Sequence, residues 1–393
     1  MKTQLHISSM SLSCAAGSGL APLRQALATG RSGLRPNDFD PCALTTWIGR
    51  VEGVERARLP ADLAEFDCRN NRLAEMGLQS DNFISHIEAL KARIAPERIA
   101  CVIGTSTAGI GCTEEAYRAL GESQHFDRRF LLPRVHTPHT SSAYLARRLD
   151  LQGPEMTIST ACSSSAKVFA AAARLIEAGL ADAALVGGVD SLCQSVLYGF
   201  HSLELVSERP CRPFDRARNG LSLGEAAGFA VLESDPENSL GRLAGWGESS
   251  DAHHMASPHP EGRGAIAAMR EALNSADIGP ADIGYINCHG TATPMNDQVE
   301  AQAIHRVFDL PPPAASTKGW TGHTLGAAGI VESVFSLLAL NDGFLPAGLN
   351  LDEPEEAWSD FILTESRHER VEHVLSNSFG FGGSNCSLIF ARS

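Results

Sequence analysis

A short strand that runs through a tight turn into a long helix of small residues constrains the fold of this chain most. Met156, Ile158 and Thr160 alternate as in a strand. The following helix, residues 164–178, is rich in alanine and has one apolar stripe. Cys162 therefore lies at a helix N-terminus, where free N–H groups and the helix dipole favour thiolate over thiol. A nucleophile often occupies such a turn, although a single cysteine is as often an inert core residue.

Strands and helices alternate along the rest of the chain. Apolar runs predict strands at 4–11, 99–103, 183–186, 228–232, 283–288, 374–377 and 387–390. Helices are predicted at 19–30, 70–76, 80–94, 141–149, 265–275, 297–308 and 325–340. This alternation is typical of an α/β protein. Similar segments begin at Pro96 and at Pro280, each leading into a strand, which indicates a duplicated fold.

Composition and charge exclude several classes of protein. A net charge of −14 argues against nucleic acid as the main partner. The ten cysteines include no C-x-x-C pair, so neither a zinc site nor a disulfide framework is expected, and a cytoplasmic location is predicted. The apolar segment 166–193 contains five charged residues and predicts no membrane span. Residues 1–17 lack the apolar centre of a signal peptide, and a first strand is expected there.

Three later stretches combine chemically active side chains with glycine. His289 ends an apolar strand and precedes Gly290, which projects the imidazole from the end of the sheet. His323 precedes a run of small residues that permits close backbone approach. The stretch 377–385, Asn-Ser-Phe-Gly-Phe-Gly-Gly-Ser-Asn, can aim backbone N–H groups inward, as an oxyanion hole requires. Taken singly, each histidine is more often structural.

Together, these four stretches resemble the freestanding, elongating type of β-ketoacyl-acyl-carrier-protein synthase, over nearly the whole chain. The segments 220–228 and 249–258 fit the same family. The resemblance implies a thiolase-like duplicated fold, with two similar halves in a layered α-β-α-β-α arrangement. We expect residues 1–235 to form the half with the cysteine, and residues 236–393 to form the half with both histidines.

The resemblance also implies an acyltransferase that performs decarboxylative Claisen condensation in fatty acid, polyketide or polyene synthesis. Cys162 would take the acyl chain, with the backbone N–H groups of Cys162 and Phe381 as the oxyanion hole. His289 and His323 would bind the thioester oxygen of the malonyl group. No metal or other cofactor is implied, because both substrates arrive on the phosphopantetheine arm of an acyl carrier protein.

Further roles follow from the same resemblance. Lys318 would support the histidine pair, and Glu300 would be a supporting carboxylate, unless it is simply an exposed helix charge. Thr291 and Thr293 would hold the pantetheine arm, and Phe381 would gate the acyl pocket. Thr107 stands where many relatives have a bulkier apolar residue beside the acyl tail, which leaves chain length open.

Carrier-protein docking is expected at a basic patch. Its candidates are Arg69, Arg72, Arg128 and Arg129, with Arg134 as a further one, whereas Glu204 falls near a position that is basic in other members. The chain would work as a homodimer, or as the active ketosynthase subunit of a heterodimer with a chain-length factor. An inactive chain-length factor would lack Cys162. A papain-like protease or a thiolase would need cysteine motifs that this sequence does not contain.

Overall fold

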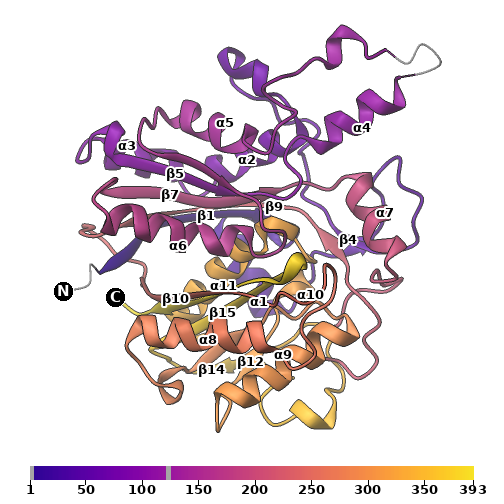
Figure 1. Cartoon of the computed structure of the whole chain (residues 1–393), viewed down its shortest axis with the longest axis vertical. Helices are drawn as coiled ribbons and strands as arrows, with labels where there is room; N and C mark the ends of the chain where they lie inside the picture. Colours follow the sequence, from indigo (N-terminus) through magenta and orange to yellow (C-terminus); the bar gives the residue numbers. More distant parts are fainter. Residues whose placement is uncertain (1–3, 121–124) are drawn as a thin grey trace.

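Strands with apolar side chains on both faces need helices on both sides of the sheet. In strand β5 (Ile99–Gly104), Ile99 and Ile103 pack into one hydrophobic cluster, while Ala100 and Val102 pack into another. The computed structural model, which describes residues 4–120 and 125–393, accordingly has strands sandwiched between helical layers (Figure 1). The chain is an α/β protein, as the alternation of elements predicts.

In the described residues, the principal sheet has eleven strands: two groups of five, and the short strand β2 (Gly17–Ser18), which pairs with β1 (Leu5–Cys14). In spatial order, the first group is β6 (Glu155–Ile158), β5, β7 (Ala183–Asp190), β9 (Ala226–Glu233) and β1. The second is β12 (Ala314–Ala315), β11 (Tyr285–Asn287), β15 (His373–Gly380), β16 (Ser384–Ala391) and β10 (Arg242–Ser250). The groups join where β1 pairs with the start of β10, at Leu5–Leu243 and His6–Arg242.

The two groups repeat one topology. In each, three strands run parallel (β6, β5 and β7; β12, β11 and β15), and the last two pair antiparallel. The two similar sequence segments have a structural counterpart, since the 3₁₀ turns Pro96–Arg98 and Pro280–Asp282 precede β5 and β11. The predicted duplicated fold is therefore confirmed, while the exact boundary at residue 235 stays a prediction.

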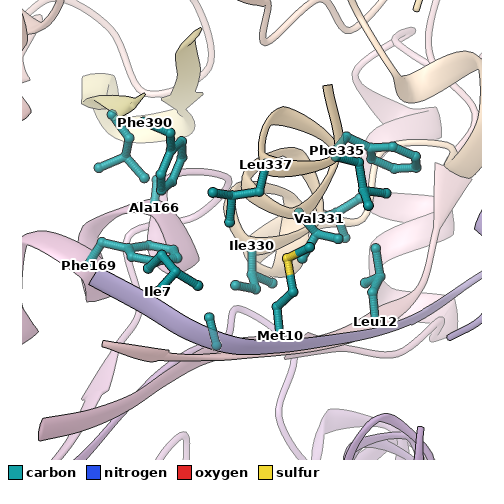
Figure 2. Packing of buried hydrophobic residues seen from close by; sticks show 14 of the residues in the cluster. Ile7, Met10, Leu12, Ala166, Phe169, Ile330, Val331, Phe335, Leu337 and Phe390 are labelled. Carbon is teal, nitrogen blue, oxygen red and sulfur yellow. The ribbon is translucent and has the colours of Figure 1, made fainter. Parts of the chain in front are cut away.

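Two helices form the layer between the strand groups, α6 (Ser164–Glu177) and α11 (Ala328–Asp342). Figure 2 shows Ile330 and Val331 of α11 packing toward Met10 and Leu12 of β1. The segment Leu325–Asp342 is long and apolar enough to cross a membrane, but 89% of it is buried inside the protein. A helix that is apolar all round is expected in such a core.

The outer layers complete the sandwich. Helices α2 (Arg69–Gln79), α3 (Phe83–Lys91) and α5 (Thr140–Leu149) pack on the first strand group, and α8 (Arg263–Ala276) and α9 (Pro294–Val307) pack on the second (Figure 1). The remaining helices are α1 (Leu20–Thr29), α4 (Ile110–Arg118), α7 (Gln194–Ser202) and α10 (Lys318–Thr321). The short strands are β2 (Gly17–Ser18), β3 (Arg35–Pro36), β4 (Trp47–Gly49), β8 (Leu223–Gly224), β13 (Phe344–Leu345) and β14 (Arg367–His368).

Strand β10 and helix α7 were absent from the sequence-based prediction, as were the short strands and helix α10. In β10, Gly245 and Gly247 make the strand hard to recognise in the sequence, because glycine has low strand propensity. A Cβ at Gly247 would lie 2.0 Å from the carbonyl oxygen of Ala268, so the close packing of α8 on β10 requires glycine there. In α7, Gly199 and several aromatic residues weaken the helical pattern.

Candidate active site

The nucleophile segment has the predicted form of strand, turn and helix. Cys162 follows β6, and α6 begins two residues later, at Ser164. Ala161 has a φ of +52°, a left-handed conformation that is strained for a residue with a side chain. The Ser164 hydroxyl stabilises this turn, because it accepts from the Thr160 N–H at 2.9 Å and donates to the Ala161 carbonyl at 2.5 Å. The turn thus presents the Cys162 thiol at the edge of the sheet.

The two predicted histidines meet this thiol. The Nε2 atom of His323 lies 2.9 Å from the Cys162 sulfur, and the rings of His289 and His323 are 5.4 Å apart and nearly perpendicular. All three side chains are buried, and one donor atom from each lies within 4.8 Å of the others. The topology explains the convergence, because Cys162, His289 and the His323 segment all follow the parallel strands β6, β11 and β12.

The Cys162 thiol is protonated in this resting site. Burial raises the pKa of the thiol to about 12, against the opposing effects of the Lys318 charge and the Phe381 backbone N–H. The expectation that the helix N-terminus favours thiolate is therefore wrong here, because desolvation outweighs the dipole. A base must take the proton, and His323 Nε2 is within reach.

Both imidazoles are neutral. Burial, the Lys318 charge and the neighbouring His323 hold the pKa of His289 well below its usual value. Burial and the same lysine lower the pKa of His323. Within the described residues, the buried Nδ1 atom of His323 has no hydrogen-bond partner, so no neighbour fixes its tautomer. The ring can accept a proton from the thiol or donate one to a substrate oxygen.

Lys318 lies directly beside His289. Its ammonium group is buried and makes short contacts to the Glu332 carboxylate and the His289 carbonyl oxygen. It also lies 3.5 Å from His289 Nδ1, a long contact that favours the tautomer with the proton on Nε2. Burial raises the pKa of Glu332 to about 7, against the effect of Lys318. The sequence analysis missed Glu332, although it is a carboxylate within the largely apolar part of helix α11.

Glu300 is a buried supporting carboxylate, not an exposed helix charge. It accepts the backbone N–H groups of His289 and Gly290, both at 2.8 Å, and the amide of Asn377 at 3.2 Å. Burial raises the pKa of Glu300 to about 7, and the two backbone hydrogen bonds oppose this rise. The Glu300 side chain therefore fixes the backbone that carries the His289 imidazole.

A cavity of about 220 Å³ opens onto the three reactive side chains. The predicted substrate-binding residues Thr291, Thr293 and Phe381 line it, and the two threonine hydroxyls are 2.8 Å apart. Thr107 does not line this cavity, and its buried hydroxyl donates to Asp190 at 2.7 Å, so its place beside the acyl tail stays a prediction.

Phe381 lines the cavity beside Cys162. Its backbone N–H points at the Cys162 sulfur. Its ring stacks on Phe200, with the ring centres 5.3 Å apart, and Phe200 in turn lies edge-on to His323. Phe200, from the unpredicted helix α7, was missed by the sequence analysis. The Phe381 ring can therefore control access to the sulfur.

Two of the predicted docking arginines are structural. The Arg69 guanidinium bonds to the buried Glu225 at 2.7 and 2.9 Å and leaves only 18% of its side chain exposed. Arg72 binds both carboxylate oxygens of Asp67 at 2.6 Å. The donors of both side chains are thus already paired within the protein, and their docking role stays a prediction. Arg128 and Arg129 are exposed and stay predictions, as does Arg134, which is 50% exposed.

The reactive cluster also resembles a metal-ligand set. One sulfur and two imidazole nitrogens are donors that Zn²⁺ accepts. The sequence analysis expects no metal, and the polarisation of a carbonyl here can come from imidazole N–H groups instead.

Comparisons with known proteins show the family to which the chain belongs. Sequence profiles of the β-ketoacyl synthase N-terminal and C-terminal domains match residues 3–238 and 240–352. The chain is 33% identical to 3-oxoacyl-[acyl-carrier-protein] synthase 2 of Coxiella burnetii, over 100% of this chain and 99% of that protein. It is 37% identical to the Rhizobium meliloti protein of the same name, over 74% and 73%.

Solved structures match over the full length. One is the complex of a ketosynthase with its chain length factor from Xenorhabdus doucetiae, with a TM-score of 0.89, 39% identity and coverage of 100% and 98%. Another is a β-ketoacyl synthase from Burkholderia phymatum, with a TM-score of 0.87, 29% identity and full coverage of both chains. The chain therefore belongs to the β-ketoacyl synthase family, and it is an acyltransferase of the 3-oxoacyl-[acyl-carrier-protein] synthase type.

Proposed function

We propose that Cys162 accepts the acyl chain and that His289 and His323 stabilise the enolate in the decarboxylative condensation. The observation that carries this assignment is the 2.9 Å contact between His323 Nε2 and the Cys162 sulfur, with His289 beside it in one cavity. In the first step, the thiol proton passes to His323 and the sulfur attacks the thioester carbonyl of an acyl carrier protein. The Cys162 and Phe381 N–H groups stabilise the oxyanion, and the carrier thiol leaves with the proton.

The second step forms the carbon–carbon bond. A malonyl thioester enters, and loss of CO₂ leaves the electron pair of the broken bond on the thioester as an enolate. His289 and His323, both neutral, donate N–H groups to the enolate oxygen, where negative charge develops. The enolate carbon attacks the acyl group on Cys162, and the carbon–sulfur bond breaks. Lys318 keeps both imidazoles neutral, since its positive charge disfavours their protonation.

An acyl carrier protein delivers both substrates in this proposal. The names of the curated relatives support this partner. The paired hydroxyls of Thr291 and Thr293 lie on the cavity wall, where they can bind the amides of a pantetheine arm. No further cofactor is needed. The ten free cysteines, nine of them buried, suit the reducing cytoplasm.

The chain is further proposed to be the active subunit of a ketosynthase–chain length factor heterodimer, with a homodimer as the alternative. Two full-length structural matches come from such complexes, at 39% and 26% identity. The reactive cysteine and histidines give this chain the catalytic role in the pair. Co-expression with a chain length factor followed by native mass spectrometry distinguishes the two assemblies by the masses of the subunits.

The reaction is tested by supplying acyl carrier proteins of varied chain length together with malonyl carrier protein. We expect intact-mass analysis to show acyl-Cys162, then a β-ketoacyl carrier protein two carbons longer. Acylation at a different cysteine, or acyl transfer without chain extension, would overturn the assignment.

A further inference from the structure

Asp190 is a buried carboxylate at the end of β7 that lies beside the active site without being part of its cavity. Within residues 4–120 and 125–393, it forms no salt bridge. Neutral donors surround it: the hydroxyls of Thr105 and Thr107 at 2.7 Å, and the backbone N–H groups of Ser106 and Thr107 at 2.8 to 3.0 Å. A buried charge persists in a protein only when such hydrogen bonds replace its hydration.

The same carboxylate also holds the segment that carries His323. Its Oδ2 atom accepts the backbone N–H of Gly326 at 2.6 Å and the Ser106 hydroxyl at 2.5 Å. A Cβ at Gly326 would lie 2.7 Å from that oxygen, so this approach depends on glycine. Leu325, between His323 and this contact, has a φ of +57°, a strained conformation that the surroundings must impose.

The second half of the fold uses a carboxylate in the same way. Glu300 accepts two backbone N–H groups in the turn after β11, which carries His289. Asp190 accepts two backbone N–H groups in the turn after β5, the counterpart of β11. Each half therefore fixes the turn after its central parallel strand with a buried carboxylate, and only Asp190 extends this support across to the His323 segment.

We propose that Asp190 is a positioning residue for condensation, because it ties the turn 105–107 to Gly326 and so holds the His323 imidazole against Cys162. This inference rests on the proposed role of His323. Asp190 is close enough to the thiol for its charge to add to the effect of burial on the pKa of Cys162. Without the carboxylate, Leu325 can relax from its strained conformation, and the imidazole loses its fixed distance to the sulfur.

The test uses Asp190→Asn, which keeps one acceptor oxygen, and Ser106→Ala, which removes one donor of the same network. Rates are divided by the amount of protein that forms acyl-Cys162, so that a misfolded fraction does not count. We expect Asp190→Asn to lower condensation about 10- to 100-fold while Cys162 still becomes acylated, and Ser106→Ala to lower it a few-fold. Glu75→Gln is the control, since Glu75 is also buried but binds Tyr144 and Arg148 outside the cavity.

A double-mutant cycle separates positioning from general stability. If Asp190 acts through His323, Asp190→Asn causes no further loss of malonyl decarboxylation in a His323→Ala background. Glu75→Gln should leave the decarboxylation rate per acylatable Cys162 unchanged in both the wild-type and the His323→Ala backgrounds. Full additivity of Asp190→Asn and His323→Ala, or wild-type condensation by Asp190→Asn, would overturn the inference. Wild-type condensation by His323→Ala alone would instead overturn the proposed role of His323.

Discussion

The Nε2 atom of His323 lies 2.9 Å from the sulfur of Cys162, although 161 residues separate them in the sequence. The two residues come from corresponding places in the two halves, the segments that lead from β6 into α6 and from β12 toward α11. The duplication of the fold thus brings a nucleophile and a base together. The chemistry of this pair is the basis of the first two predictions.

Replacing Cys162 by alanine should abolish acylation and lower condensation by at least about 10³-fold, because no other group can carry the acyl chain. Decarboxylation of malonyl carrier protein should persist, since the two imidazoles remain. Intact-mass analysis after incubation with acyl carrier protein measures the first effect, and CO₂ release measures the second. Cys386→Ala, at a buried cysteine of strand β16 that does not line the cavity, is the control and should acylate normally.

Replacing His323 by alanine should separate the two half-reactions. Acylation of Cys162 should be slower but complete, because water can take the thiol proton. Condensation should fall about 10²- to 10³-fold, the usual cost of losing one hydrogen-bond donor to a developing oxyanion. Single-turnover measurements from preformed acyl-enzyme give this rate directly. Normal condensation by the variant would contradict the proposed role.

Stability should depend on pH through Glu300. Burial raises the pKa of Glu300 in the folded state to about 7, from an ordinary value of 4.5. The folded protein therefore binds more protons than the unfolded chain between these values, and its free energy of unfolding falls as the pH rises from about 4.5 to 7. The shift corresponds to at most ~3 kcal/mol. Urea unfolding at pH 5 and pH 8 should show this loss in the wild type and a smaller one in Glu300→Gln; equal losses would refute the assignment.

The contact between the central helices should not tolerate a side chain at Gly329. A Cβ there would lie 2.2 Å from the backbone nitrogen of Ala166, and backbone atoms of two packed helices cannot move apart cheaply. Gly329→Ala should lower the free energy of unfolding by about 3 kcal/mol or prevent folding. Gly199→Ala is the matched control: no atom lies within 4 Å of its added Cβ, and helix α7 should gain up to ~1 kcal/mol. Thermal unfolding of both variants checks the contrast.

The sequence by itself determined the main strands and helices, because their hydrophobic periodicity is local. It also identified the residues of the reactive cluster, Cys162, His289 and His323, because together with their flanking segments they resemble the β-ketoacyl synthases. Strand β10 was not predicted, because its glycines are required by the close packing of helix α8. The contacting residues of that helix lie 20 or more positions away in the sequence.

Only the tertiary structure decided which charged side chains remain exposed and which are paired inside the protein. Arg69 looks like a surface cation in the sequence, but it neutralises the buried Glu225, 156 residues away. Glu300 looks like an exposed helix charge, but it holds the backbone of His289. Thr107 looks like a wall of the acyl pocket, but its hydroxyl binds Asp190. Burial and hydrogen-bond partners are properties of the packed chain, because they depend on which distant segments the fold brings together.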